Sequence, residues 1–117
     1  MELNYYTSED KVLLAVDCII FGFDKHHLKI LLVKRNIEPE KGKWSLIGGF
    51  LKQDENLDEA AARVLETLTG LHDIYMEQLY AYSKIDRDPG NRTISVAYFA
   101  LIDVASHQFE GVQLESA

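Results

Sequence analysis

The chain has 117 residues, of which 47% are hydrophobic and 26% are charged, and its formal net charge is −7. This length and composition predict one small globular domain. Because the chain is acidic and has no basic stripe, it is not expected to supply the phosphate contacts of a DNA-binding surface.

Cys18 is the only cysteine of the chain, which excludes an internal disulfide and a cysteine zinc cluster. It stands in the apolar run VDCIIF and is therefore predicted to be a buried thiol. The sequence has no signal peptide and no stretch near twenty apolar residues, so the expected compartment is the cytoplasm.

The first half of the chain reads as strands joined by polar turns. Residues 12–23 are almost all apolar and rich in branched side chains, which predicts a central buried strand. After it we expect a turn with two exposed histidines at residues 24–27 and a partner strand at 28–35. A polar loop at 36–43 and a short strand at 44–47 then lead to the glycine pair at 48–49.

One helix follows, between clear start and stop signals. Asn56 is a plausible N-cap, with Glu59 three residues later as in a capping box, and Gly70 is a C-terminal cap. The apolar residues between them share one helical face: Leu57, Ala60, Ala61, Val64, Leu65 and Leu68. Residues 74–85 and 92–102 predict two more strands, giving the order β-β-β-α-β-β.

A spaced motif covers this helix and the loop before it. Gly49 is followed by Glu55 after five residues, by Arg63 after seven more, and then by Leu65 and the pair Gly70-Leu71. This is the skeleton of the Nudix box, and the chain therefore resembles the Nudix family. The remaining glutamate positions of the box fall on these three residues: Val64, Thr67 and Leu68.

In active Nudix enzymes these glutamates hold magnesium, which prefers oxygen ligands in octahedral geometry. Val64 and Leu68 offer no oxygen, Thr67 offers only a neutral hydroxyl, and Glu66 is displaced by about 100° around the helix. Glu55 alone could hold a metal weakly through water, but an ion pair with Arg63 is the favoured interpretation. The altered box thus predicts a domain without a metal or cofactor that is not an enzyme.

Several polar residues invite a ligand-binding role, each beside a structural alternative. Asp17 interrupts an apolar strand and must be paired, protonated or facing a cavity. Lys34 and Arg35 end a strand, where cations suit a phosphate or simply meet solvent. Trp44 could stack on a ring or fill the core, and Gly48-Gly49 could admit a ligand or only form a turn.

The segment from Ile85 to Leu101 is the second strong signal. Its charged side chains surround a Pro-Gly turn and suit sugar hydroxyls and phosphates, although Asp-Pro-Gly is also an ordinary turn sequence. The charged candidates of this segment are Asp86, Arg87, Asp88 and Arg92.

With VDCIIFGF, LLVKR and WSLIGGF, these motifs make residues 5–103 similar to the Nudix-related transcriptional regulators (NrtR-like), and most similar to the arabinose-responsive AraR branch. The usual Nudix proline before the glycine pair is Ile47 here, which fits the regulators better than the enzymes. The resemblance implies an α/β/α sandwich with a mixed sheet, a homodimer, and an effector that releases DNA from a C-terminal winged-helix domain. Because the chain stops at Ala117 without a helix-turn-helix pattern, we expect an N-terminal fragment that is truncated at its C-terminus.

The sequence thus predicts an effector-sensing domain, with L-arabinose as first ligand and ADP-ribose as second, that shifts the arrangement of a dimer. The main alternative is a divergent hydrolase acting on ADP-ribose or a related nucleoside diphosphate derivative, with metal held by Glu55, Glu59 or Glu66. A third is a dimerisation module with an empty pocket. The predicted ligand-binding residues are Asp17, Lys34, Arg35, Trp44, Gly48, Gly49, Glu55, Asp86, Arg87, Asp88 and Arg92.

Overall fold

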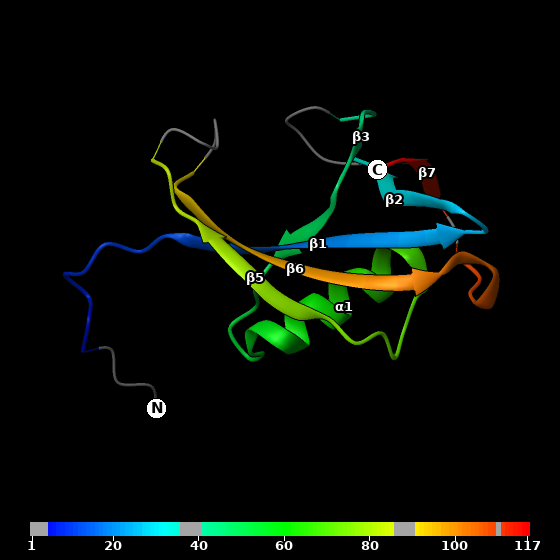
Figure 1. Ribbon diagram of the computed structural model, residues 1–117. Coiled ribbons are helices and arrows are strands. Elements are labelled where there is room, and N and C mark those ends of the chain that lie inside the picture. Colours follow the sequence, from blue (N-terminus) through cyan, green and yellow to red (C-terminus); the bar gives the residue numbers. More distant parts are fainter. Residues whose placement is uncertain (1–4, 36–40, 86–90, 110) are drawn as a thin grey trace.

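The computed structural model describes residues 5–35, 41–85, 91–109 and 111–117. These residues form a seven-stranded mixed sheet with one α-helix against it (Figure 1). The elements are, in chain order, β1 (Leu13–Asp24), β2 (His27–Lys34), β3 (Trp44–Ser45), β4 (Ile47–Phe50), α1 (Leu57–Thr69), β5 (Glu77–Tyr82), β6 (Thr93–Asp103), the 3-10 helix η1 (Val104–Ser106) and β7 (Val112–Ser116).

The sheet is built around the long strand β1. Its strand order is β3-β2-β1-β6-β5, with β4 also pairing with β1 and β7 with β2. β1 and β6 run parallel, from the pair Leu13 and Thr93 to the pair Phe23 and Asp103, while the other strand pairs are antiparallel. The predicted mixed sheet is confirmed.

Helix α1 covers one face of the sheet (Figure 1). The predicted capping box is confirmed, because the Glu59 amide donates to Asn56 Oδ1 at 2.8 Å and the Asn56 amide donates to Glu59 Oε1 at 2.9 Å. Gly70 ends the helix at φ 81°, a conformation that costs glycine little. Val64 and Leu65 are buried against the sheet, and each side chain of this size contributes roughly 1.5–3 kcal/mol.

The other face of the sheet, the open face, has no helix over it within the described residues. α1 is the sole α-helix there, so the second helical layer of the expected sandwich does not occur in this part of the chain. On β1, Val16, Cys18 and Ile20 are fully buried beneath α1, whereas Leu13 and Phe23 at its ends are 41% and 43% exposed. The prediction of a buried strand is therefore wrong for these end positions.

Two further details differ from the sequence prediction. A turn is one of the two interpretations of the glycine pair, and it is wrong, because Gly48 and Gly49 lie within β4 and pair with Asp17 and Val16 of β1. Strand β7 was not predicted, and it adds to the outer side of β2 with Leu31 opposite Leu114. Within the described residues, no helix has the length and apolar character needed to span a membrane.

Candidate functional site

The loop and helix of the box are joined by an ion pair. Arg63 donates to Glu55 from Nε at 2.9 Å and from Nη2 at 2.6 Å, and it also donates to the Phe50 carbonyl at 2.7 Å. The Lys52 amide donates to the same Glu55 carboxylate at 2.9 Å. The favoured interpretation of Glu55 as the ion-pair partner of Arg63 is confirmed.

These contacts favour the ionised form of Glu55. The hydrogen bond from Arg63 is the main cause that lowers the Glu55 pKa to about 2, with the Lys52 amide acting in the same direction. Because both carboxylate oxygens already accept hydrogen bonds, a metal ion at Glu55 would have to compete with the guanidinium of Arg63.

The three altered box positions differ in environment. Val64 is 3% exposed and packs beneath β4, Leu68 is half-buried against the core, and Thr67 is exposed. Within the described residues, no group of three or more histidine, cysteine, aspartate or glutamate side chains could hold a metal ion. The residues at these positions therefore do not fit the magnesium site that the family uses.

Gly49 allows this close packing of helix on strand. A Cβ atom added at Gly49 would lie 2.8 Å from Val64 Cγ2, closer than carbon atoms approach in proteins. Gly49 of the box thus leaves the space that Val64, at the first altered glutamate position, occupies. The close contact of α1 with β4 therefore needs a glycine at residue 49 when residue 64 is valine.

Its neighbour Gly48 has a different role, on the open face. A Cβ atom there would lie 2.6 Å from Asp17 Oδ1, so the absence of a side chain at Gly48 makes room for the Asp17 carboxylate. Asp17 lies between Gly48 of β4 and Ala97 of β6 in the register of the sheet. The structure therefore places Asp17 and Gly48, two of the predicted ligand-binding residues, side by side in the sheet.

Small residues surround Asp17, and larger ones lie beyond them. Ala15 and Ser95 fill the next row of the register and are buried, while Phe50 and Tyr82 at the two ends of that row are 45% and 40% exposed. On the Asp17 row, the far neighbour of Ala97 is Tyr80, whose ring meets that of Tyr82 edge-on at 4.9 Å between centroids. This part of the open face therefore carries the Asp17 carboxylate on a floor of small residues with aromatic rings at its edges.

The two tyrosines of β5 were not among the predicted site residues. Tyr80 and Tyr82 stand in the sequence as ordinary alternating strand residues. Their proximity to Asp17 follows from the pairing of β1 with β6, which lies 80 residues later in the chain, and of β6 with β5. The sequence signal that could have identified them is the alternation of Tyr80 and Tyr82 in the predicted strand 74–85, which places both rings on one face of the sheet.

Lys34 and Trp44 face each other across β2 and β3, and both are exposed. Trp44 belongs to β3 and Gly48 to β4, four residues later, so the chain between them spans at most about 14 Å. The core role considered for Trp44 is wrong, since it is 44% exposed. The backbone of Arg35 closes the loop through bonds to Gly42 and Lys43 at 2.9 and 2.8 Å.

Arg92 stands immediately before β6, and its carbonyl accepts from the Leu13 amide at 2.9 Å. Its Nη1 atom is buried without a hydrogen-bond partner in the described part of the structure. Three of the charged candidates predicted at the Pro-Gly turn, Asp86, Arg87 and Asp88, lie outside the described residues.

The fold, the box and the register of the glycine pair together define a Nudix domain. The NUDIX domain family model matches residues 11–115, and the chain belongs to that family. Over 98 residues the chain is 42% identical to the ADPR responsive transcriptional repressor NtrR of Acinetobacter baylyi, and the match covers 82% of this chain and 39% of the repressor.

Two further relatives involve ADP-ribose by name. The chain is 41% identical over 90 residues to the ADP-ribose pyrophosphatase of Methanocaldococcus jannaschii, covering 77% of this chain and 50% of the enzyme. The NUDIX domain of Shewanella oneidensis NrtR, solved in complex with ADP ribose, superposes with a TM-score of 0.81 at 30% identity, over 93% of this chain and 75% of that one. The chain thus spans half or less of the length of the two curated relatives.

These relatives correct two predictions. The prediction that the chain is not an enzyme, drawn from its altered box, is contradicted by 41% identity with an ADP-ribose pyrophosphatase. Loss of the three box glutamates therefore does not separate the chain from the hydrolases of its family. The arabinose-responsive branch is not supported either, because the similar repressor is one that responds to ADPR.

Proposed function

We propose that this domain binds ADP-ribose on the open face of the sheet, in a site centred on Asp17. The observation that carries the proposal is the close approach of Gly48 to the Asp17 carboxylate, at a position flanked by buried small residues and exposed aromatic ones. The similarity to a repressor that responds to ADPR and to a NUDIX domain solved with ADP ribose supports the choice of ligand.

Each part of ADP-ribose finds a suitable group on this face. The Asp17 carboxylate can accept hydrogen bonds from ribose hydroxyls, and the Tyr80 and Tyr82 rings offer an apolar surface for the adenine. Lys34, the last residue of β2, supplies a cation for the diphosphate, and Arg35 follows it directly in the chain. Because the proposed site runs across four neighbouring strands from β4 to β5, it extends beyond the size of one sugar ring.

In the same proposal the bound nucleotide acts as an effector of the larger protein. A ligand alters an equilibrium only as far as it binds one state better than another, and the spacing of two domains in a dimer is such an equilibrium. DNA is contacted in this proposal by a segment outside the present chain, which agrees with the net charge of −7.

Hydrolysis of ADP-ribose is the second candidate function, favoured by the identity with an ADP-ribose pyrophosphatase. Of the three glutamates considered as alternative metal ligands, Glu55 is bonded to Arg63 and Glu59 accepts from the Asn56 amide in the capping box. Glu66 is exposed on α1 and is the candidate left for a water-mediated metal contact.

The test is thermal unfolding of the chain with ADP-ribose, with and without magnesium. At 100 times its dissociation constant a ligand adds about 2.7 kcal/mol, which corresponds to a shift in Tm on the order of 10 °C for a domain of this size. The Asp17→Asn variant is expected to lose most of the shift, while Asp24→Asn, at the exposed end of the same strand, keeps it. Absence of a shift in the unmodified chain refutes the proposal.

Release of AMP from the same samples separates the two candidates. Magnesium-dependent AMP release that Glu66→Gln abolishes establishes hydrolysis, and binding without AMP release supports the effector role. L-arabinose serves as the comparison ligand, and it is expected to leave Tm unchanged.

A further inference from the structure

β5 forms one edge of the sheet, because its strand partner in the described part of the chain is β6 alone. All six residues of β5 are exposed, among them Leu79 at 54% and Tyr80 at 62%. An edge strand presents a row of backbone N–H and C=O groups on its outer side, and such a row is a template for another strand.

A bulge fixes the faces of this edge. Gln78 pairs with Tyr98 and Tyr80 with Ala97, so Leu79 is an extra residue between two register pairs. Glu77, Tyr80 and Tyr82 consequently share the open face, since they stand opposite residues of β6 on that face. The extra residue shifts the two halves of β5 by one position relative to each other.

We propose that β5 pairs in antiparallel fashion with β5 of a second copy of this chain, about a two-fold axis at Ala81. This register places Tyr80 opposite Tyr82 of the second copy. In the proposed dimer the paired segment extends two residues past the end of β5 at Tyr82. Because Leu79 drops out of the count, the next pairs are Gln78 with Ser83 and Glu77 with Lys84. All of these pairs keep matching faces, as an antiparallel ladder requires.

Charge complementarity selects both the partner and the register. β5 begins at the acidic Glu77, and the basic Lys84 stands two residues after its end at Tyr82, so a two-fold axis between them creates two opposite-charge pairs at once. Moving the axis one step toward the start of the strand puts Glu77 opposite Tyr82 and removes both pairs. The pattern is therefore complementary to itself, which a peptide from an unrelated protein would match only by coincidence.

The proposed contact joins two sheets into one and also adjoins the aromatic edge of the open face. A pairing of two short strands buries less than the roughly 800 Å² per partner of a standard interface, so we expect a dimer that dissociates on dilution. The inference does not rest on ADP-ribose binding, and it gives a location to the homodimer that the sequence predicts.

Charge reversal tests the proposal by equilibrium sedimentation of the 117-residue chain. Lys84→Glu places like charges opposite each other twice and is expected to weaken the dimer roughly tenfold. Adding Glu77→Lys to that variant restores opposite charges and the dimer. Lys84→Glu is the cleaner single change, because Glu77 also accepts a bond from the Tyr75 hydroxyl at 3.2 Å.

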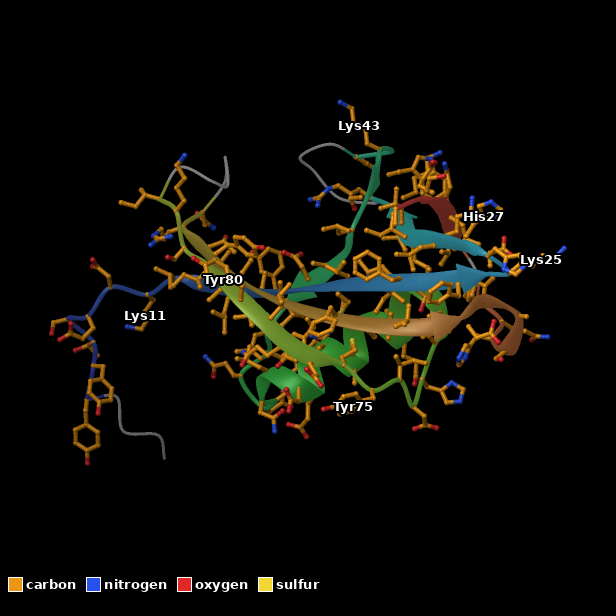
Figure 2. The ribbon with its side chains drawn as sticks, in the orientation of Figure 1. Lys11, Lys25, His27, Lys43, Tyr75 and Tyr80 are labelled. Atoms are coloured by element: carbon orange, nitrogen blue, oxygen red, sulfur yellow. The ribbon has the colours of Figure 1, made fainter. Side chains whose placement is uncertain are left out.

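The control is Lys25→Glu, the same change of charge at the tip of the β1–β2 hairpin (Figure 2), which is expected to leave the dimer unchanged. A dimer that persists equally in Lys84→Glu and in the double variant refutes pairing through β5, while the dimer itself stands. A chain that stays monomeric up to millimolar concentration refutes the dimer as well as its pairing through β5. Thermal shifts with ADP-ribose on each variant keep this result separate from the proposed function.

Cysteine cross-linking tests the register directly. In the proposed pairing Ala81 lies opposite its own copy, so Ala81→Cys is expected to form a disulfide-linked dimer under mild oxidation. Gln78→Cys lies opposite Ser83 of the second copy and is expected to cross-link only when mixed with Ser83→Cys. The native Cys18 is buried and does not compete. Failure of Ala81→Cys to cross-link in a sample that sediments as a dimer refutes the register.

Discussion

The packing of Gly49 against Val64 makes a quantitative prediction about helix α1 and strand β4. Gly49→Ala inserts a methyl group whose carbon lies 2.8 Å from Val64 Cγ2. Overpacking of this kind costs about 1–3 kcal/mol, and Val64 cannot turn away easily because it is β-branched and 3% exposed. Val64→Ala alone removes two buried methyl groups and costs about 1.5–3 kcal/mol.

The double variant separates steric conflict from other effects. When Val64 is alanine the methyl group at residue 49 gains room, so the two costs should not add. We expect the double variant to be more stable than the sum predicts by about 1–2 kcal/mol. Gly48→Ala is the matched control, since its methyl group meets Asp17 on the other face and should combine additively with Val64→Ala.

Urea unfolding followed by circular dichroism measures all six proteins, and the midpoints are compared at a common m-value. Additivity of Gly49→Ala and Val64→Ala within about 0.5 kcal/mol would show that the close approach does not limit stability. A relief of equal size with Gly48→Ala would show a general effect of loosening the helix instead.

Three further predictions concern single groups. The folded-state pKa of Glu55 is lowered to about 2, so its ion pair with Arg63 stabilises the fold fully above the unfolded pKa near 4.5. This contribution is lost as pH falls from 4.5 toward 2. Glu55→Gln should therefore flatten this part of an acid-unfolding curve, and an unchanged curve would contradict the assignment. Tyr98→Phe removes the hydroxyl that donates to Asp58 at 2.6 Å and should lower the free energy of unfolding by about 1–2 kcal/mol in urea titration, while an effect near zero would mean that water replaces the bond. Burial raises the pKa of the Cys18 thiol to about 12, so a thiol reagent at pH 8 should label it only in denaturant, and rapid labelling of the native chain would contradict this burial.

The sequence was sufficient for helix α1 because its signals are local. The capping residues Asn56 and Glu59, the apolar face and Gly70 all lie within fifteen residues, and the structure agrees with each of them. The Glu55–Arg63 pair was predictable for the same reason, since both residues stand in one spaced motif.

Non-local features could not be predicted in the same way. Strand β7 is short and half-exposed, and it becomes a strand because β2 offers it an edge. Gly48 and Gly49 have the composition of a turn, but pairing with β1 holds them in a strand. The proximity of Tyr80 to Asp17 could not be predicted from the sequence either, because it depends on Ala97 of β6 lying between them in the register.

The parallel pairing of β1 with β6 has a consequence for the order in which the domain folds. Each partner pair, such as Leu13 with Thr93, is separated by 80 residues, so closing this central ladder costs the entropy of a long loop before any of its contacts form. During synthesis on a ribosome, β1 cannot pair with β6 until β6 has emerged. Until then the edge of β1 that faces β6 stays unpaired. The chain therefore spends its synthesis with its most apolar strand exposed, which makes this the period in which it is most prone to aggregate.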